Sequence, residues 1–285
     1  MDPPDRVVGV DFSGARDARE NVWIAECERR DGTLRLTGLA PARERLDPSG
    51  RDPAATAAAL AGFLRGRSGA AGLDVPFSLP APVARGLGAE TWRELLEVVA
   101  GFDDASAFDT ACQRATPGDR TYARRATDAA HGSFSPYHFF VKRQTYTGMS
   151  DVLRPLVVGG DARVLPMDID VARDGDRLLL LETYPAAVLD GLDLHREEYK
   201  GTGSRERERR GANLAGLRSR VSVPDRFADR ALADTDGDAL DAIAAAVGTA
   251  RAFETDLTPA TTEPRLEGAI YPLVNDQSAG GPHDT

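Results

Sequence analysis

The chain of 285 residues has very few cysteines and lysines. It contains two cysteines, Cys27 and Cys112, and only Lys142 and Lys200 are lysines among 35 basic residues. Two widely separated cysteines exclude a disulfide framework and a cysteine-based metal site, so we expect two reduced thiols. No apolar run approaches the roughly 20 residues that a membrane span requires, and no secretory signal is visible. These absences predict a cytoplasmic protein without membrane association.

The charge of the chain is strongly acidic. Acidic residues outnumber basic ones by 45 to 35, which gives a formal net charge of −10. An acidic, lysine-poor surface is typical of proteins from a halophilic, high-salt cytoplasm, although a GC-rich genome also replaces lysine with arginine. The overall charge therefore provides no electrostatic footprint for nucleic-acid binding. The overall charge does not exclude such binding, because a cleft in an acidic halophilic protein can carry a different charge from the rest of the surface.

Several common catalytic motifs are also missing. The sequence has no P-loop, no G-x-S-x-G and no paired C-x-x-C. The histidines His131, His138 and His195 show no ligand spacing, so we expect them in loops or on the surface rather than in a zinc site.

What the chain does contain is a set of acidic residues that close apolar segments. VVGVD ends at Asp11, AAGLD at Asp74 and LLLLE at Glu182. Removing an unpaired charge from water is costly, and carboxylates at one sheet edge repel unless a cation or a proton lies between them. In addition, DGDALDAIAAAV sets Asp238 and Asp241 three residues apart on one face of an alanine-rich helix. The pattern indicates metal-assisted phosphoryl chemistry.

The order of the expected elements indicates an α/β fold with a mixed sheet. Three adjacent antiparallel strands are expected first, at residues 6–12, 21–30 and 32–40. The last two are joined by an Asp31-Gly32 hairpin turn. Residues 52–67 predict a crossover helix with Asp52 as its N-cap, which leads to a parallel strand at 70–77.

An α-rich insertion follows the fourth strand. It covers about residues 80–170, and we interpret it as a lid or substrate wall within a single domain, 1–285. The sheet then resumes with a strand buried on both faces, at 176–185. Expected after it are a short helix in 185–194, helices at 204–221 and 233–253, an edge strand in 267–273 and a disordered tail at about 276–285.

GVDFSG, GLDVPFSLP, ETYPA and DALDAIAAAVGTARA together resemble domain-of-unknown-function family 429. RRATDAAHGSFSP and KRQTYTGMSDVLRPL are similar to further segments of that family, so the resemblance covers most of residues 6–275. The family is described as predicted nucleases of ribonuclease-H-like fold, and the order of strands and helices matches that topology. The D-A-L-D-A motif is also similar to the last helix of Holliday-junction resolvases, in which acids one turn apart bind metal.

The chemistry of such a site explains why acids are needed. Two-metal hydrolysis uses Mg²⁺ or Mn²⁺ ions about 4 Å apart, and these hard cations prefer carboxylate oxygens. We expect Asp11 to bridge the ions and Asp74 to supply a second ligand. Asp238 and Asp241 would complete the metal site from the opposite side, and Glu182 would ligate a metal directly or orient a ligand.

Each acid also has a simpler interpretation. Asp11 could accept backbone hydrogen bonds in a turn, Asp74 could cap its loop, and Glu182 could pair with a buried arginine. Asp238 could be a helix N-cap, and Asp241 could complement the helix dipole.

The turn after the first strand and the insertion provide candidate substrate contacts. Ser13 follows Asp11, Arg125 and Asp128 lie in RRATDAA, and Lys142 and Gln144 lie in VKRQT. The basic side chains could hold a phosphate while Gln144 adds a directional hydrogen bond. The alternative is a solvated surface or internal ion pairs.

The leading hypothesis is a divalent-metal-dependent nuclease that acts on DNA or RNA. The main competitor is an actin-like or sugar-kinase-like ATP-dependent phosphotransferase, because DFSG resembles a phosphate loop. That class needs a second glycine-rich loop, for which VVGGDA (157–162) is a poor match. A third hypothesis is a non-catalytic member of the fold that binds a nucleotide or a partner. The sequence leaves open whether the chain forms a homodimer.

Overall fold

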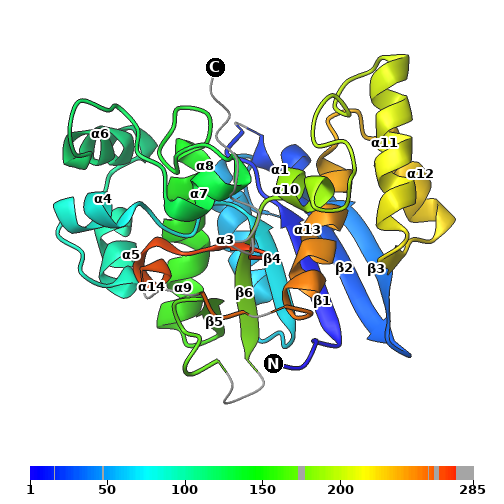
Figure 1. The fold of residues 1–285 in the computed structure, drawn as a ribbon, viewed down its shortest axis with the longest axis horizontal. Coiled ribbons are helices and arrows are strands. Elements are labelled where there is room, and N and C mark those ends of the chain that lie inside the picture. Colours follow the sequence, from blue (N-terminus) through cyan, green and yellow to red (C-terminus); the bar gives the residue numbers. More distant parts are fainter. Residues whose placement is uncertain (16, 47, 173–176, 256, 260–262, 274–285) are drawn as a thin grey trace.

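A mixed β-sheet runs through the centre of the molecule (Figure 1). The computed structural model describes residues 1–15, 17–46, 48–172, 177–255, 257–259 and 263–273. Within these residues the sheet has eight strands. They are β1 (Arg6–Asp11), β2 (Trp23–Arg30), β3 (Thr33–Pro41), β4 (Ala70–Asp74), β5 (Ala162–Leu165), β6 (Leu178–Thr183), β7 (Val221–Ser222) and β8 (Ile270–Tyr271).

The strand order is β5-β6-β4-β1-β2-β3-β7, with β8 paired to β6. β1, β2 and β3 are antiparallel neighbours, whereas β4 is parallel to β1 and β6 is parallel to β4. Asp31 and Gly32 both have positive φ, 50° and 77°, as a tight turn between right-twisted strands requires. The three antiparallel strands, the parallel strands beside them and the pairing of residues 270–271 with the sheet are therefore confirmed.

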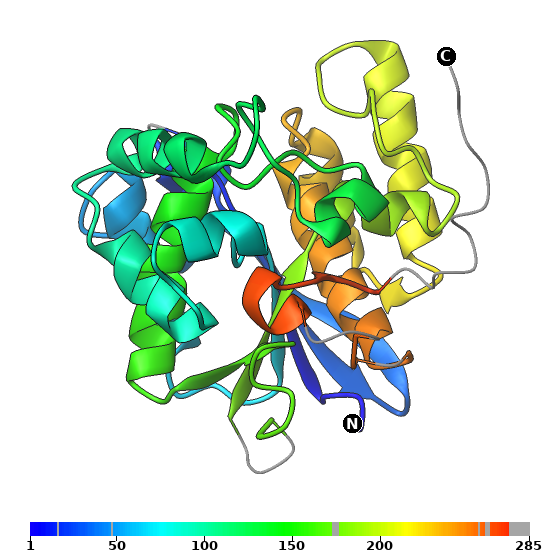
Figure 2. The same ribbon diagram turned by 60° about the vertical axis from the view of Figure 1, so that its left-hand side comes forward.

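Helices cover both faces of the sheet, which Figure 2 shows from a second side. Two helices of four residues lie near the N-terminal end of the chain and one near the C-terminal end. They are α1 (Ala18–Asn21), α2 (Ala42–Arg45) and α14 (Pro264–Glu267). On one side lie α3 (Pro53–Leu64), α4 (Ala81–Gly86), α5 (Trp92–Ala100), α6 (Ala105–Ala115), α7 (Ala126–His131), α8 (Lys142–Thr147), the π-helix η1 (Gly148–Leu153) and α9 (Arg154–Val158), several of which pack on one another rather than on the strands. The other side packs against α10 (Pro185–Asp190), α11 (Ser204–Leu217), α12 (Asp225–Ala233) and α13 (Asp238–Ala252).

The insertion between β4 and β6 is helical as expected but also contains a strand. β5 lies within the predicted span 80–170 and extends the sheet beyond β6, to which it is parallel. Its four residues, ARVL, form neither a continuous apolar run nor a strict alternation, so no pattern marks them as a strand.

Helix boundaries near the C-terminal end also differ from the expectation. The helix predicted at 204–221 ends at Leu217, because Val221 pairs with Leu34 of β3. The helix predicted at 233–253 begins only at Asp238, because Gly237 before it adopts a left-handed conformation with φ of 79°. The predicted tail at 276–285 lies outside the described residues.

In the described part of the chain, no helix is long and apolar enough to cross a membrane. Cys27 and Cys112 are both free and buried.

Candidate metal centre

The site begins at the carboxyl ends of two central parallel strands. Asp11 of β1 and Asp74 of β4 are direct neighbours in the parallel pairing, and so are Gly9 and Gly72 two residues earlier. Because side chains two apart in a strand point to the same side, both aspartates face α13, as do both glycines. Asp11 and Asp74 therefore lie at the same edge of the sheet, on neighbouring parallel strands.

The two glycines allow α13 to lie unusually close to the sheet. A Cβ on Gly9 would lie 2.2 Å from the carbonyl oxygen of Ala242, and one on Gly72 would lie 1.8 Å from Thr249 Oγ1. Real Cβ atoms do not approach other atoms so closely, so only glycine fits at these positions. The alanine-rich sequence of α13 serves the same packing, because most of its residues are fully buried.

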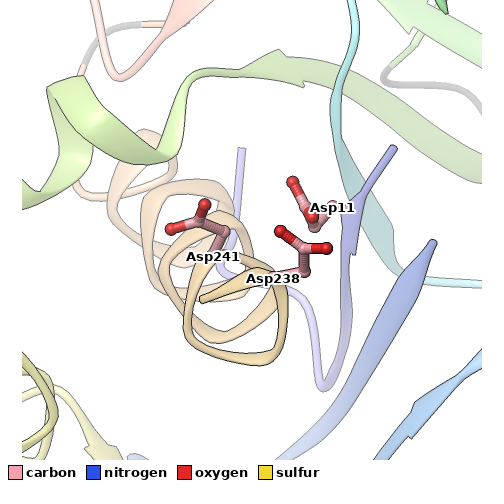
Figure 3. Close-up of side chains that lie close together, drawn as sticks. All are labelled: Asp11, Asp238 and Asp241. Carbon is pink, nitrogen blue, oxygen red and sulfur yellow. The ribbon is translucent and has the colours of Figure 1, made fainter. Parts of the chain in front are cut away.

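The first turn of α13 carries Asp238 and Asp241 to the end of β1. Oxygen atoms of Asp11, Asp238 and Asp241 all lie within 4.8 Å of one another. Figure 3 shows Asp11 on the strand and the other two on the helix. Three carboxylates at this spacing can hold one divalent cation, since hard cations prefer oxygen ligands. Asp74 lies beside this group but outside it.

The carboxylate of Asp238 does not cap its own helix. Gly237 is the N-cap, and the side chain of Asp234 accepts the hydrogen bond from Ala239 N at 2.8 Å. Asp238 makes no side-chain cap of its own. The N-cap interpretation of Asp238 is therefore wrong, and the side chain of Asp234 accepts the hydrogen bond from the first turn instead.

The negative charges of the buried carboxylates repel one another. Burial raises the pKa of Asp11 well above its ordinary value, and the charges of Asp238 and Asp241 raise it further. Burial, followed by the charge of Asp241, likewise raises the pKa of Asp74. The pKa of Asp238 is raised to about 6, mainly by burial. Bringing like charges together out of water has this effect unless a cation compensates.

One cation of the chain itself already lies at the site. Lys200 Nζ is 2.7 Å from Asp241 Oδ2 and 3.3 Å from Asp238 Oδ1. The neighbouring Tyr199 donates a hydrogen bond from its hydroxyl to Asp241 Oδ1 at 2.7 Å. The Asp241 interaction raises the pKa of the Lys200 ammonium although burial opposes it. Lys200 thus partly neutralises the acidic cluster.

The sequence analysis missed Tyr199 and Lys200 as site residues. They lie in the irregular segment between α10 and α11, where Glu198 and Gly201 have positive φ. The segment packs on the start of α13, so a Cβ on Gly237 would lie 3.0 Å from Lys200 Cγ. The available signal was the identity of the residue, because Lys200 is one of only two lysines in an arginine-rich chain.

Glu182 does not join the carboxylate cluster. It pairs with Leu73 in the β4–β6 register, so it points to the face opposite Asp74. There it accepts hydrogen bonds from Phe77 N at 2.9 Å and from Arg125 Nη1 and Nη2 at 2.7 and 2.5 Å. The simpler interpretation, a pair with a buried arginine, describes its contacts. The run of four leucines before it hides which residues face which side.

Arg125 and Asp128 form the rest of this buried network. Nε and Nη2 of Arg125 donate to Asp128 at 3.0 and 2.6 Å, and Nη1 also donates to Glu267 O at 3.1 Å. Together with the two bonds to Glu182, these occupy all five guanidinium N–H groups. The Arg125 side chain is 0% exposed. Arg125 therefore has no donor left for the predicted phosphate contact and instead ties the insertion to β6.

The other predicted substrate contacts have partners within the chain. Lys142 Nζ pairs with Asp109 Oδ2 at 2.5 Å. Gln144 Nε2 donates to the carbonyl oxygen of Asp74 at 2.6 Å, and Ser13 Oγ accepts from Ala15 N at 3.1 Å. Gln144 and Ser13 thus hold the backbone at the ends of β4 and β1.

The insertion nevertheless borders the site. A Cβ on Gly14 would lie 2.7 Å from Gln144 N and 2.9 Å from Arg143 Cβ, so the start of α8 packs on the turn after β1. A small pocket of about 60 Å³ lies beside Asp74, and its lining includes Gln144 and Phe134. Residues of the insertion therefore form one wall next to the carboxylates.

Comparisons of the chain with protein-family models, with curated proteins and with solved structures find no match in any of the three.

Proposed function

We propose that the protein hydrolyses phosphodiester bonds with Mg²⁺ or Mn²⁺ and acts on nucleic acid. The observation that carries this proposal is the close approach of Asp11, Asp238 and Asp241, whose oxygens lie within 4.8 Å of one another. Burial and the charges of Asp238 and Asp241 raise the pKa of Asp11. A buried group of acids without enough positive charge fits a divalent cation.

The residues of the chain would have distinct roles. Asp11, Asp238 and Asp241 would hold the cation, and Asp74, next to Asp11 in the sheet, would hold a second ion or orient the attacking water. When bound, such ions activate water and stabilise the charge that develops on the phosphate. Lys200 would keep the acids together before the cation binds. Gln144 fixes the end of β4 through its bond to Asp74 O.

The ribonuclease-H-like fold and membership of domain-of-unknown-function family 429 are part of the same proposal. The central order β3-β2-β1-β4-β6, with the first three strands antiparallel, supports it. So does the position of the acids on β1, on β4 and on the helix that packs against them. The two buried, free cysteines agree with the proposed cytoplasmic location.

The phosphotransferase alternative gains no support. The glycines of VVGGDA end α9, and Asp161 pairs with Arg65 at 3.0 Å. Asp161 directly precedes β5, which is parallel to β6. The segment therefore lies at the amino end of the parallel strands, on the edge of the sheet opposite to Asp11.

The test is hydrolysis of bis(4-nitrophenyl) phosphate and of a labelled oligonucleotide after removal of bound metal with a chelator. We expect activity to return with Mn²⁺ and to fall to background in Asp11→Asn. Asp225→Asn is the matched control, because that side chain is 99% exposed and lies on α12. Equal activity of Asp11→Asn and Asp225→Asn, or none in the wild type with Mn²⁺ or Mg²⁺, would refute the proposal.

A further inference from the structure

An exposed group of aromatic rings lies in the segment between α7 and α8. Phe134, Phe139 and Phe140 are 46%, 56% and 67% exposed. With His138 they form what we term the aromatic cluster: Phe134 stacks on His138 at 4.6 Å and 12°, and Phe139 lies 4.0 Å from Phe140, centroid to centroid. Contiguous exposed apolar surface is disfavoured in a monomer unless it binds something.

The segment that carries the cluster is held firmly. Tyr137 is fully buried, and its hydroxyl accepts a hydrogen bond from Ala123 N at 2.6 Å. The ring of Tyr122 lies 4.8 Å from His138. The carbonyl oxygen of His138 accepts from Val141 N and Lys142 N, both at 2.9 Å. The rings are therefore presented on ordered backbone, which reduces the entropy lost when a ligand binds.

One ring of the cluster borders Asp74, which lies beside the candidate metal centre. Phe134 lines the same pocket of about 60 Å³ as Asp74 and Gln144. Arg143 lies three residues after Phe140 and packs against Gly14, in the turn that follows Asp11. A chain whose phosphate lies at the carboxylates would therefore reach these rings with its adjacent units.

The charges around the cluster suit an anion with aromatic groups. Arg124, whose charge acts on His138, and Arg143 are both exposed, whereas Asp109 is paired with Lys142. Burial and the charge of Arg124 lower the pKa of His138. A flat aromatic surface with flanking arginines is the combination that binds single-stranded nucleic acid.

We propose that the aromatic cluster stacks the bases of a single strand whose backbone passes the carboxylates. The proposal rests on the function proposed above and specifies its substrate as single-stranded or unpaired nucleic acid. In a duplex the bases are stacked on one another and their faces are not available to these rings.

Binding can be measured separately from cleavage. Fluorescence anisotropy in chelator would compare a labelled single strand, the same length of strand with abasic sites, and a duplex. We expect the wild type to prefer the base-containing single strand, and Phe139→Ala/Phe140→Ala to bind it about tenfold or more weakly. The abasic strand should bind both proteins alike. Val158→Ala is the control, because Val158 is 66% exposed and lies on α9.

Two results would overturn the stacking proposal. One is equal affinity of the wild type for the base-containing and abasic strands. The other is a double variant that binds like wild type but changes from dimer to monomer in sedimentation, which would show that a second copy of the chain covers the rings. Mn²⁺-dependent hydrolysis by the wild type tests the proposed function independently, so the failure of either proposal can be distinguished.

Discussion

Gly9 of β1 lies directly opposite Gly72 of β4, two residues before Asp11 and Asp74. The helix α13 crosses both glycines so closely that neither position has room for a Cβ atom. Since the first turn of α13 carries the two other acids, this contact sets the distance between the carboxylates of the helix and those of the strands.

Gly9→Ala should therefore damage both stability and the site. The added Cβ would lie 2.2 Å from Ala242 O and 2.3 Å from Ala246 N, both of them backbone atoms. We expect the free energy of unfolding in urea to fall by about 3 kcal/mol. Gly62→Ala in α3 is the control, because nothing lies within 4 Å of its Cβ, and it should stabilise by about 0.5–1 kcal/mol. Similar stability of the two variants would mean that α13 does not approach β1 this closely.

The metal-free protein should lose stability as the pH rises through the acidic range. The folded-state pKa of Asp238 is raised from 3.8 to about 6, and that of Asp11 is also raised. A raised carboxyl pKa means that the folded state binds the proton more tightly than the unfolded state. The resulting stabilisation is complete below about pH 4 and is lost as the pH rises through about 6.

Asp11→Asn isolates this effect. In chelator, the stability of the variant minus that of wild type should be larger at pH 7 than at pH 4.5. The reason is that the amide of the variant carries no charge at either pH. With saturating Mn²⁺ at pH 7 the order should reverse, since only the wild type is stabilised by the cation. If the difference in stability between Asp11→Asn and wild type does not change with pH, the carboxylates do not repel one another as described.

Lys200 and a divalent cation should compete for Asp241. Removing the ammonium in Lys200→Met should strengthen Mn²⁺ binding and lower the stability of the metal-free protein at pH 7. The Lys200 side chain is 49% exposed, so solvent screens its charge. We therefore expect the free energy of Mn²⁺ binding and the free energy of unfolding each to change by only about 0.5–1 kcal/mol. Calorimetric titration gives the affinity. Lys142→Met, which alters the lysine paired with Asp109, should leave Mn²⁺ affinity unchanged; an equal change in both variants would exclude direct competition.

Glu182 should matter for folding rather than for metal. Glu182→Gln removes one charged partner of the buried Arg125 network. We expect the free energy of unfolding to fall by about 3–5 kcal/mol. The folded variant should bind Mn²⁺ as wild type does, because the Glu182 carboxylate is bonded to Phe77 N and Arg125 and is not among the three acids that meet within 4.8 Å. Arg125→Met should behave in the same way. A large loss of Mn²⁺ affinity with little loss of stability would instead identify Glu182 as a ligand.

The sequence was sufficient to predict the parts of the site that depend on local patterns. Asp11 and Asp74 end strands whose parallel pairing follows from a crossover helix, and Asp238 and Asp241 share a helix face by their spacing. The sequence does not reveal on which side of the sheet Glu182 lies, because leucine occupies both faces of β6. Nor does it reveal that Arg125 is buried, which depends on contacts with Glu182, 57 residues away.

Local sequence patterns could not identify Lys200 as a site residue, for a different reason. It reaches Asp238 and Asp241 from an irregular segment about 40 residues earlier, and no periodic pattern places such a segment. The short strand β5 was missed because ARVL shows neither apolar pattern of a strand, and its position depends on pairing with β6.

The most direct test of the metal centre is the anomalous scattering of Mn²⁺ in crystals soaked with that ion. The account predicts a manganese peak between the carboxylates of Asp11, Asp238 and Asp241, with Lys200 Nζ moved away from Asp241. No peak at this position at millimolar Mn²⁺, with Lys200 still bonded to Asp241, would contradict it.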